Sequence, residues 1–250
     1  MVELSESQKT DFFCSHLLLA EDDPVCMQIT ASCLEALGYT YDVVKNGHEA
    51  LLALAERDYG LVLMDCMMPI IGGFEATGII RDPESNVRCH TIPVIALTGM
   101  AEEDLDYCLD AGMNDYLPKP VRIDNLIDIL VKWLPGSPQT YEKGAAHKAG
   151  LQVQFINDEA VLALFAAKAP EYAKAIQESL TLGTALAMRQ HAHKLAGAAA
   201  AIGARNVAEL AAEIEVLGAD NDIINAAQKV LQLSEALEKL LTILTRHSNT

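Results

Sequence analysis

Basic residues are scarce in this sequence, and long apolar runs are missing from it. Among its 250 residues, 18 are lysine or arginine and 35 are aspartate or glutamate, which gives a formal net charge of −17. A chain this acidic lacks the basic surface that nucleic acids or anionic membranes would require. No stretch approaches the ~18 consecutive apolar residues of a membrane span. We therefore expect neither nucleic-acid binding nor direct membrane insertion. With 51% hydrophobic residues, the chain is nevertheless apolar enough to fold.

Cysteine pairs and a secretory signal are also missing. The six cysteines form no C-x-x-C pair and have no histidine spacing typical of zinc. We expect them to be small buried residues in a reducing compartment. The start of the chain, MVELSESQKTDFFCSH, has no basic flank followed by an apolar core. These features predict a cytoplasmic location.

Charge and composition divide the chain near residue 150. Residues 1–150 carry an acidic excess of 14 and residues 151–250 an excess of only 3. The stretch LPGSPQTYEKGAAHKAG, after Trp133, is rich in proline, glycine and small polar residues, as linkers are. We predict an N-terminal extension, an α/β domain, a linker and a helical domain, at residues 1–14, 15–135, 136–152 and 153–250.

Short apolar runs alternate with amphipathic helical patterns in the first half. The predicted strands are 16–20, 41–44, 60–64, 91–97 and 114–117, and the predicted helices are 24–37, 47–57, 74–81, 101–109 and 122–133. This alternation predicts a doubly wound, five-stranded parallel sheet. The second half is rich in helix-forming residues, with breaks near 169–170, 181–184, 202–203 and 218–222. It predicts four or five helices in an antiparallel bundle.

Acidic residues follow the predicted strands of the first half. Glu21 and Asp22 follow the first strand and Asp65 ends the third, while Thr98 and Lys119 follow the fourth and fifth. The carboxyl ends of parallel strands meet at one edge of the sheet, so these side chains should converge. Crowded carboxylates favour a hard cation such as Mg²⁺. The sequence thus predicts an acidic, metal-binding site that could accept a phosphoryl group.

Four segments of this half, LLLAEDDPV, LVLMDCMMPIIGGFE, PVIALTG and AGMNDYLPKP, together resemble the receiver domain of two-component response regulators. The resemblance covers about residues 15–135 and implies a flavodoxin-like fold. It also implies a cis Lys119–Pro120 bond. The implied roles are Mg²⁺ binding by Glu21, Asp22, Asp65 and the Met67 carbonyl, phosphorylation of Asp65, switching by Thr98 and Tyr116, and a phosphate-binding Lys119.

Two histidines lie on one predicted helix of the second half. With Leu195 at the centre of the buried face and about 100° per residue, His191 lies ~40° from the centre and His193 ~160° from it. His193 should therefore face out, with Arg189 and Gly197 one turn to either side. An open imidazole beside a glycine and a guanidinium suits phosphoryl transfer. A solvated surface histidine is the alternative.

The segment HKLAGAAAAIGA resembles the active helix of histidine-containing phosphotransfer (HPt) domains. The helices around it also resemble this family, over about residues 153–247. The resemblance implies that His193 is the phosphoryl acceptor and that Gly197 leaves space beside it. One departure is Ala196, which replaces the lysine usual in the family. Arg189 and Lys194 are the nearby cations that would take its place.

Together, the two resemblances imply a phosphorelay. A partner histidine kinase would phosphorylate Asp65, and His193 would pass the group to a downstream receiver, or the flow would be reversed. No glycine-rich ATP-binding motif is visible, so we expect no kinase activity from this chain alone. It resembles the cytoplasmic output end of a bacterial hybrid sensor kinase, or a free-standing relay protein. Two alternatives are a phosphorylation-gated binding module in which only Asp65 is active, and a dehalogenase-like phosphatase, which would need an acid where Met67 stands.

Overall fold

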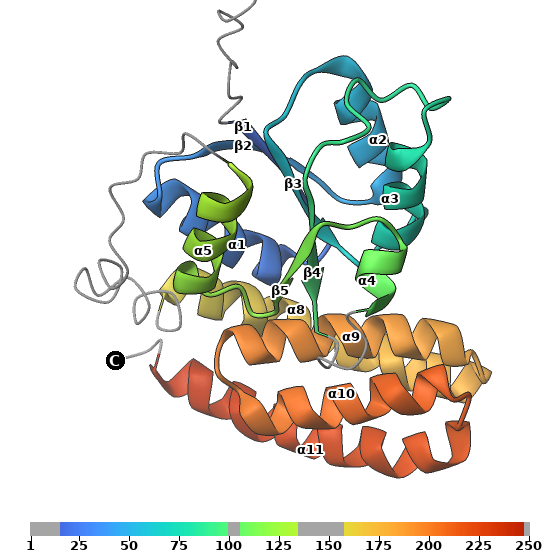
Figure 1. The fold of residues 1–250 in the computed structure, drawn as a ribbon. Helices are drawn as coiled ribbons and strands as arrows, with labels where there is room; N and C mark the ends of the chain where they lie inside the picture. The colour runs from blue at the N-terminus through green and yellow to red at the C-terminus, as the bar shows by residue number, and fades with distance from the viewer. Residues whose placement is uncertain (1–15, 100–105, 135–157, 248–250) are drawn as a thin grey trace, which may run out of the picture.

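The computed structural model describes residues 16–99, 106–134 and 158–247, so the predicted N-terminal extension and linker lie outside the described residues. Its first half is a parallel sheet in the order β2-β1-β3-β4-β5 (Figure 1). The strands are β1 (His16–Ala20), β2 (Thr40–Val44), β3 (Leu61–Asp65), β4 (Val94–Thr98) and β5 (Asp115–Pro118). The helices are α1 (Pro24–Ala36), α2 (Gly47–Glu56), α3 (Gly73–Arg81), α4 (Asp106–Asp110) and α5 (Ile123–Trp133). The predicted doubly wound sheet is confirmed.

Helices cover both faces of this sheet because successive strand residues point to opposite sides. Leu17 and Leu19 of β1 are buried in one cluster with residues of α1 and α5. Leu18 and Ala20 are buried in a second cluster with residues of α2 and α3. Figure 1 shows α1 and α5 on one side of the sheet and α2, α3 and α4 on the other. Because the strands are parallel, the polar residues that follow them are gathered at one edge of the sheet.

The fourth strand begins later than predicted. It starts at Val94 rather than at residue 91. Pro93 lies just before it and has no N–H to donate to a neighbouring strand. The Pro93 carbonyl still accepts a hydrogen bond from the Val62 N–H at 2.9 Å. The ladder is thus complete only from the residue after the proline.

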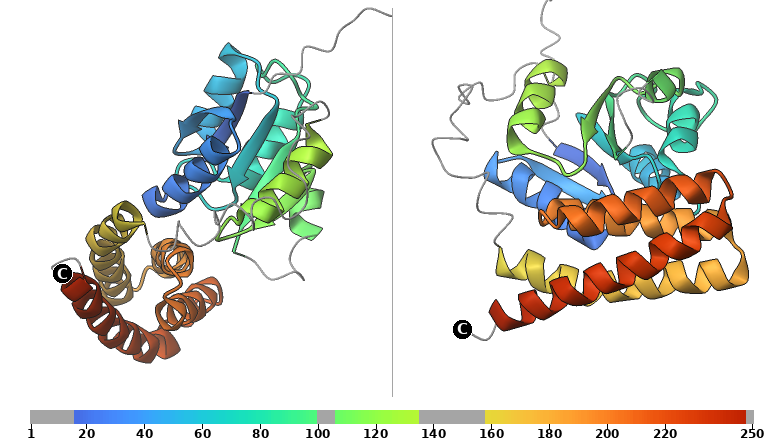
Figure 2. Two further views of the ribbon diagram at one scale, coloured as in Figure 1. Left: turned by 90° about the vertical axis from the view of Figure 1, so that its left-hand side faces the viewer. Right: turned by 90° about the horizontal axis from the view of Figure 1, so that it is seen from below.

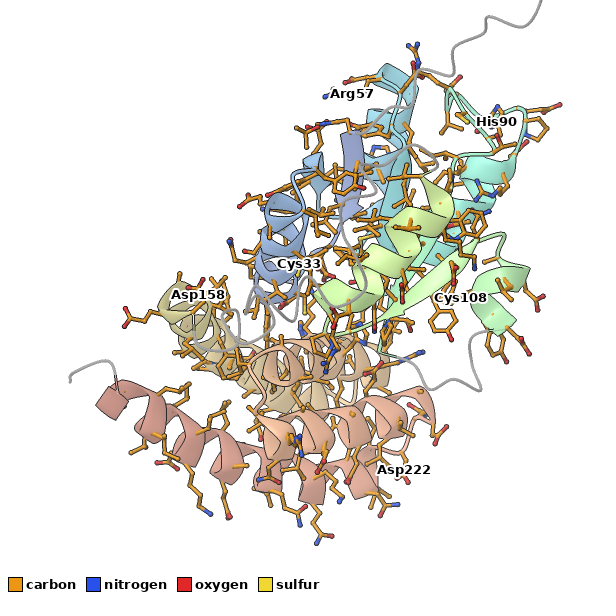
Figure 3. The ribbon with its side chains drawn as sticks, turned by 60° about the vertical axis from the view of Figure 1, so that its left-hand side comes forward. Cys33, Arg57, His90, Cys108, Asp158 and Asp222 are labelled. Carbon is orange, nitrogen blue, oxygen red and sulfur yellow. The ribbon has the colours of Figure 1, made fainter. Side chains whose placement is uncertain are left out.

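The second half is a four-helix bundle. Its helices are α8 (Glu159–Leu182), α9 (Ala185–Ala201), α10 (Arg205–Ala219) and α11 (Ile223–His247). Gly183 and Gly203 end the first two helices in the left-handed conformation, with φ of 68° and 74°. Asp158, labelled in Figure 3, caps α8 by accepting a hydrogen bond from the Ala160 N–H at 2.8 Å. The predicted helical bundle is confirmed.

The predicted break at residues 169–170 is wrong. Helix α8 continues through Pro170. The proline ring lies on the exposed face, while Phe165, Ala169 and Ile176 of the same helix are buried in the bundle core. Packing of these residues therefore keeps the helix intact where the proline removes a backbone hydrogen bond.

The cysteine prediction holds for four residues and fails for one. Cys26, Cys33, Cys66 and Cys108 are free and buried, as expected. Cys89 is exposed, because it lies in the irregular segment between α3 and β4 rather than in a core element. Cys14 lies outside the described residues. Within the described part of the chain, no helix is both long and apolar enough to span a bilayer.

The bundle packs against the receiver-like half. Figures 1 and 2 show α8 and α9 lying beside the lower end of α1. Val25 and Ile29 of α1 are buried in the same apolar cluster as Phe165 and Leu195 of the bundle. Figure 3 shows side chains filling the space between the two halves. The contact thus has an apolar component, and it covers the carboxyl edge of the sheet.

Candidate functional site

Three carboxylates meet at the carboxyl edge of the sheet. Glu21 and Asp22 lie between β1 and α1, and Asp65 is the last residue of β3. One oxygen from each lies within 4.8 Å of the other two. Glu21 and Asp65 are almost fully buried, with exposed fractions of 1% and 0%. The sequence prediction of a convergent acidic site agrees with this geometry.

Lys119 bridges two of these carboxylates. Its Nζ lies 2.7 Å from Glu21 Oε2 and 2.9 Å from Asp65 Oδ2. The Lys119 backbone N–H donates to the Thr98 carbonyl at 2.7 Å, and the following Lys119–Pro120 bond is cis, as predicted. The two ion pairs place the ammonium group between the ends of β1 and β3.

The charges of the site are strongly coupled. Burial and the charge of Asp65 raise the pKa of Glu21 to about 8. Burial acts against ionisation of Asp65 as well, but Lys119 and His193 outweigh it and lower the pKa of Asp65 to about 2. Burial also opposes the charge of Lys119, yet Asp65 and Glu21 hold its pKa well above the ordinary value. Asp65 is therefore an ionised carboxylate beside the Lys119 ammonium group.

The donor set fits a hard divalent cation. Asp22 Oδ1 is buried and has no hydrogen-bond partner among the described residues. Burial raises the pKa of Asp22, and its pairing with Lys194 offsets only part of this effect. Carboxylate oxygens are the ligands that Mg²⁺ prefers, and a cation would relieve the cost of burying three acids together. Glu21, Asp22 and Asp65 are thus the residues present to hold a metal ion.

The remaining predicted residues of this half lie around the acids. The Met67 N–H donates to Asp65 Oδ1 at 3.1 Å, so the loop after β3 orients the carboxylate. Thr98 is buried at the end of β4, and Tyr116 of β5 is 37% exposed. Gly99 follows Thr98, and a Cβ at this position would lie 3.9 Å from His193 Cε1.

His193 faces Asp65 across the contact between the two halves. Its Nε2 lies 3.9 Å from Asp65 Oδ1. Only 8% of His193 is exposed, so the prediction that it is solvent-accessible is wrong. The helix geometry placed His193 on the outer face of the bundle, and that face is covered by the other domain. The structure therefore brings the two predicted phosphoryl acceptors together.

Glu215 of α10 holds the other nitrogen of the imidazole, and sequence reasoning missed it. Its Oε1 lies 3.0 Å from His193 Nδ1. Burial lowers the affinity of His193 for a proton, but Asp65 and Glu215 outweigh burial and raise the pKa of His193 to about 9. Glu215 is 22 positions from His193, and its contact depends on how α10 is packed against α9, which no local pattern specifies.

Three residues near His193 have distinct surroundings. Arg189 packs against α10, where a Cβ at Gly218 would lie 2.9 Å from Arg189 Cβ. Lys194 reaches the other domain, and its Nζ lies 2.5 Å from Asp22 Oδ2. Gly197 faces α1, where an added Cβ would lie 3.2 Å from the Cys26 Sγ. Lys194 and Gly197 thus belong to the contact between the domains.

Tyr172 provides a further contact that sequence reasoning missed. Its hydroxyl donates to Asp23 Oδ2 at 2.7 Å. The other oxygen of Asp23 caps α1 by accepting from the Val25 and Cys26 N–H groups at 3.0 and 2.8 Å. One carboxylate therefore both begins α1 and binds the bundle.

Comparison with known families identifies a two-component signalling protein. Residues 17–131 match the response regulator receiver domain, and residues 160–243 match the Hpt domain. The chain consists of a receiver domain followed by an Hpt domain, the pair of domains used in phosphorelay signalling. No kinase domain is found in this chain.

Several relatives are hybrid kinases. A 119-residue match to the hybrid signal transduction protein dokA of Dictyostelium discoideum is 40% identical, covering 48% of this chain and 7% of dokA. A 157-residue match to the sensor histidine kinase GacS of Pseudomonas protegens is 32% identical, covering 61% of this chain and 17% of GacS. The chain thus spans less than a fifth of either relative.

A solved structure is also similar. It is the receiver domain of a sensor histidine kinase from Pseudomonas aeruginosa, with a magnesium ion in its active-site cleft. The two are 38% identical, and the match covers 48% of this chain and 98% of that domain, with a TM-score of 0.44.

Proposed function

We propose that this chain accepts a phosphoryl group on Asp65 from a partner histidine kinase and passes it to His193, from which a downstream receiver takes it. The reverse flow would use the same two residues. The observation that carries the proposal is the 3.9 Å separation of His193 Nε2 and Asp65 Oδ1 within a buried contact. This separation leaves room for a phosphorus atom in line between the two reacting atoms.

The transfer step follows from the surroundings of the two acceptors. The lone pair on His193 Nε2 attacks phosphorus, the bond from phosphorus to Asp65 breaks, and its electrons return to the carboxylate. The raised pKa of His193 keeps both ring nitrogens protonated in the metal-free, unphosphorylated site, so Nε2 must first lose its proton to solvent. The remaining ring proton then lies on Nδ1, where Glu215 accepts it at 3.0 Å. Lys119 neutralises charge on the phosphoryl oxygens and on the departing carboxylate.

Mg²⁺ is the cofactor that we propose, held by Glu21, Asp22, Asp65 and the carbonyl of Met67. When bound, it supplies further positive charge to the phosphoryl oxygens. Thr98 and Tyr116 are proposed to respond to phosphorylation, because Thr98 is buried at the end of β4 beside the site. If Thr98→Ala left the affinity for a partner equally sensitive to phosphorylation, the proposed switching role of Thr98 would be wrong.

The donor must reach Asp65 before the bundle covers it. Asp65 is 0% exposed and His193 is 8% exposed, so a kinase at Asp65 or another receiver at His193 can dock only when the two domains separate. We propose the domain limits 15–135 and 153–250, and the family matches over 17–131 and 160–243 support these limits. We also propose a cytoplasmic location. Kinase and receiver partners follow from the chemistry of the two acceptors.

Radiolabelled transfer tests the proposal. A donor kinase with labelled phosphate is incubated with Mg²⁺ and wild-type chain, Asp65→Asn, His193→Gln or the control His191→Gln. We expect base-stable phosphohistidine in wild type and in His191→Gln. His193→Gln should carry only base-labile aspartyl phosphate, and Asp65→Asn should carry no label. Label that stays on Asp65 in wild type would contradict the relay and favour the phosphorylation-gated binding module.

A further inference from the structure

A cation of the Hpt domain is seated on one of the proposed metal ligands. Lys194 Nζ lies 2.5 Å from Asp22 Oδ2. The Asp22 side chain is only 5% exposed and that of Lys194 is 24% exposed. Solvent and salt therefore screen this ion pair less than they would screen a surface pair. The receiver's acidic site thus receives a positive charge from the second domain.

The charges in the site decide whether this extra cation is favourable. Glu21, Asp22 and Asp65 contribute three negative charges when all are ionised, and Lys119 contributes one positive charge. His193 and Glu215 of the docked domain form a pair of opposite charges and leave this sum unchanged. A bound Mg²⁺ would then balance the site. Adding Lys194 to the balanced site places two cations on one carboxylate a few ångströms apart, where they repel each other.

We propose that Mg²⁺ binding to the unphosphorylated receiver and the seating of Lys194 on Asp22 oppose each other, so that the metal loosens the contact between the domains. This inference rests on the proposed function, because it assumes that Asp22 is a metal ligand. Thermodynamic linkage makes the effect reciprocal: the docked Hpt domain weakens Mg²⁺ binding by the same factor by which Mg²⁺ weakens docking.

Phosphorylation reverses the balance. Replacing the carboxylate charge of Asp65 with an acyl phosphate adds about one negative charge, because a phosphoryl group carries about −2 near neutral pH. The metal-bound, phosphorylated site again has room for one cation, and Lys194 is the residue positioned to supply it. Docking is then favoured when Asp65 carries the group that His193 is to receive.

A different role for Lys194 predicts the opposite result. Lys194 forms an ion pair with Asp22 Oδ2, and Asp22 Oδ1 has no hydrogen-bond partner among the described residues. If Lys194 served to hold Asp22 in a metal-binding orientation, its removal would weaken Mg²⁺ binding. The two roles are therefore separated by the sign of one change in affinity.

Isothermal titration calorimetry of the metal-free, unphosphorylated full chain with Mg²⁺ measures that sign. We expect Lys194→Gln to bind Mg²⁺ about five-fold more tightly than wild type, at the lower end of ordinary coupling between sites. Lys194→Arg should behave like wild type because it keeps the charge. The matched control is Lys174→Gln, which removes the same charge from an exposed pair with Glu178 on α8.

Equal or weaker Mg²⁺ binding by Lys194→Gln would overturn the inference while leaving the proposed function intact. Tighter binding by both Lys194→Gln and Lys174→Gln would also overturn it, because net charge rather than the contact with Asp22 would then be responsible. Absence of Mg²⁺ binding in every chain would instead contradict the metal site, and with it this inference. Circular dichroism spectra of all four chains check that the fold is kept.

Discussion

At the scale of single residues, the two histidines of α9 have opposite electrostatic surroundings. His193 lies between Asp65 and Glu215, which raise its pKa to about 9 despite burial. His191 lies two positions away, and burial together with Lys194 lowers its pKa. The two histidines thus differ in pKa because they lie on different faces of α9, and only His193 lies between two acids.

These shifts predict different titrations in metal-free protein. The folded pKa of His193 is raised above 6.5, so the stability contributed by its protonation is fully present below pH 6.5 and is lost as pH rises through about 9. His191 should titrate below 6.5. Nitrogen NMR of the imidazoles in EDTA measures both. Glu215→Gln should lower the midpoint of His193, and two midpoints together near 6.5 in wild type would contradict the described contacts.

At the scale of elements, the alternation of apolar runs was enough to predict the sheet because both of its faces are buried. Helix α8 was harder to predict from local pattern. Proline inside a helix usually marks an end, yet the core contacts of Phe165, Ala169 and Ile176 are stronger than that local signal. Tertiary packing thus decided the element, and Pro170 remains as a local cost.

Replacing this proline should stabilise the bundle. Pro170→Ala restores an N–H donor on an exposed helical face and removes no core contact, so the free energy of unfolding should rise by up to about 3 kcal/mol. Urea unfolding followed by circular dichroism at the helix band measures the change. Glu171→Ala is the matched control, since it breaks only the exposed pair with Lys168 and should change stability little. Unchanged or lower stability of Pro170→Ala would show that the proline is not a local cost.

At the scale of the whole molecule, the contact between the domains brings the acceptors together and also hides Asp65. Tyr172 binds Asp23, Lys194 binds Asp22, and Val25 of α1 packs in the bundle core. Sequence patterns gave the acidic site and His193, because strand ends and helix faces are local properties. They could not predict the contact of Tyr172 with Asp23 or that of Glu215 with His193. The partners are 149 and 22 positions apart in the sequence, and their contacts depend on how separate helices pack.

Weakening this contact should expose Asp65 to small donors. Tyr172→Phe removes the hydroxyl that donates to the Asp23 carboxylate, a bond worth about 1.5–3 kcal/mol, and leaves the cap of α1 in place. We expect an acyl phosphate to phosphorylate Asp65 about tenfold faster in this variant, measured as initial label incorporation. Tyr107→Phe, on the exposed face of α4, should match wild type. A rate in Tyr172→Phe no faster than wild type would show that the Tyr172 bond does not limit access.

The central claim is that Asp65 and His193 exchange a phosphoryl group within one chain. The most direct measurement is the rate of phosphohistidine formation from phosphorylated Asp65 on serial dilution. The wild-type chain is compared with an equal mixture of Asp65→Asn and His193→Gln chains. We predict that the wild-type rate constant stays the same on dilution, while transfer in the mixture slows in proportion to concentration. A wild-type rate that falls with dilution as steeply as that of the mixture would contradict transfer within the chain.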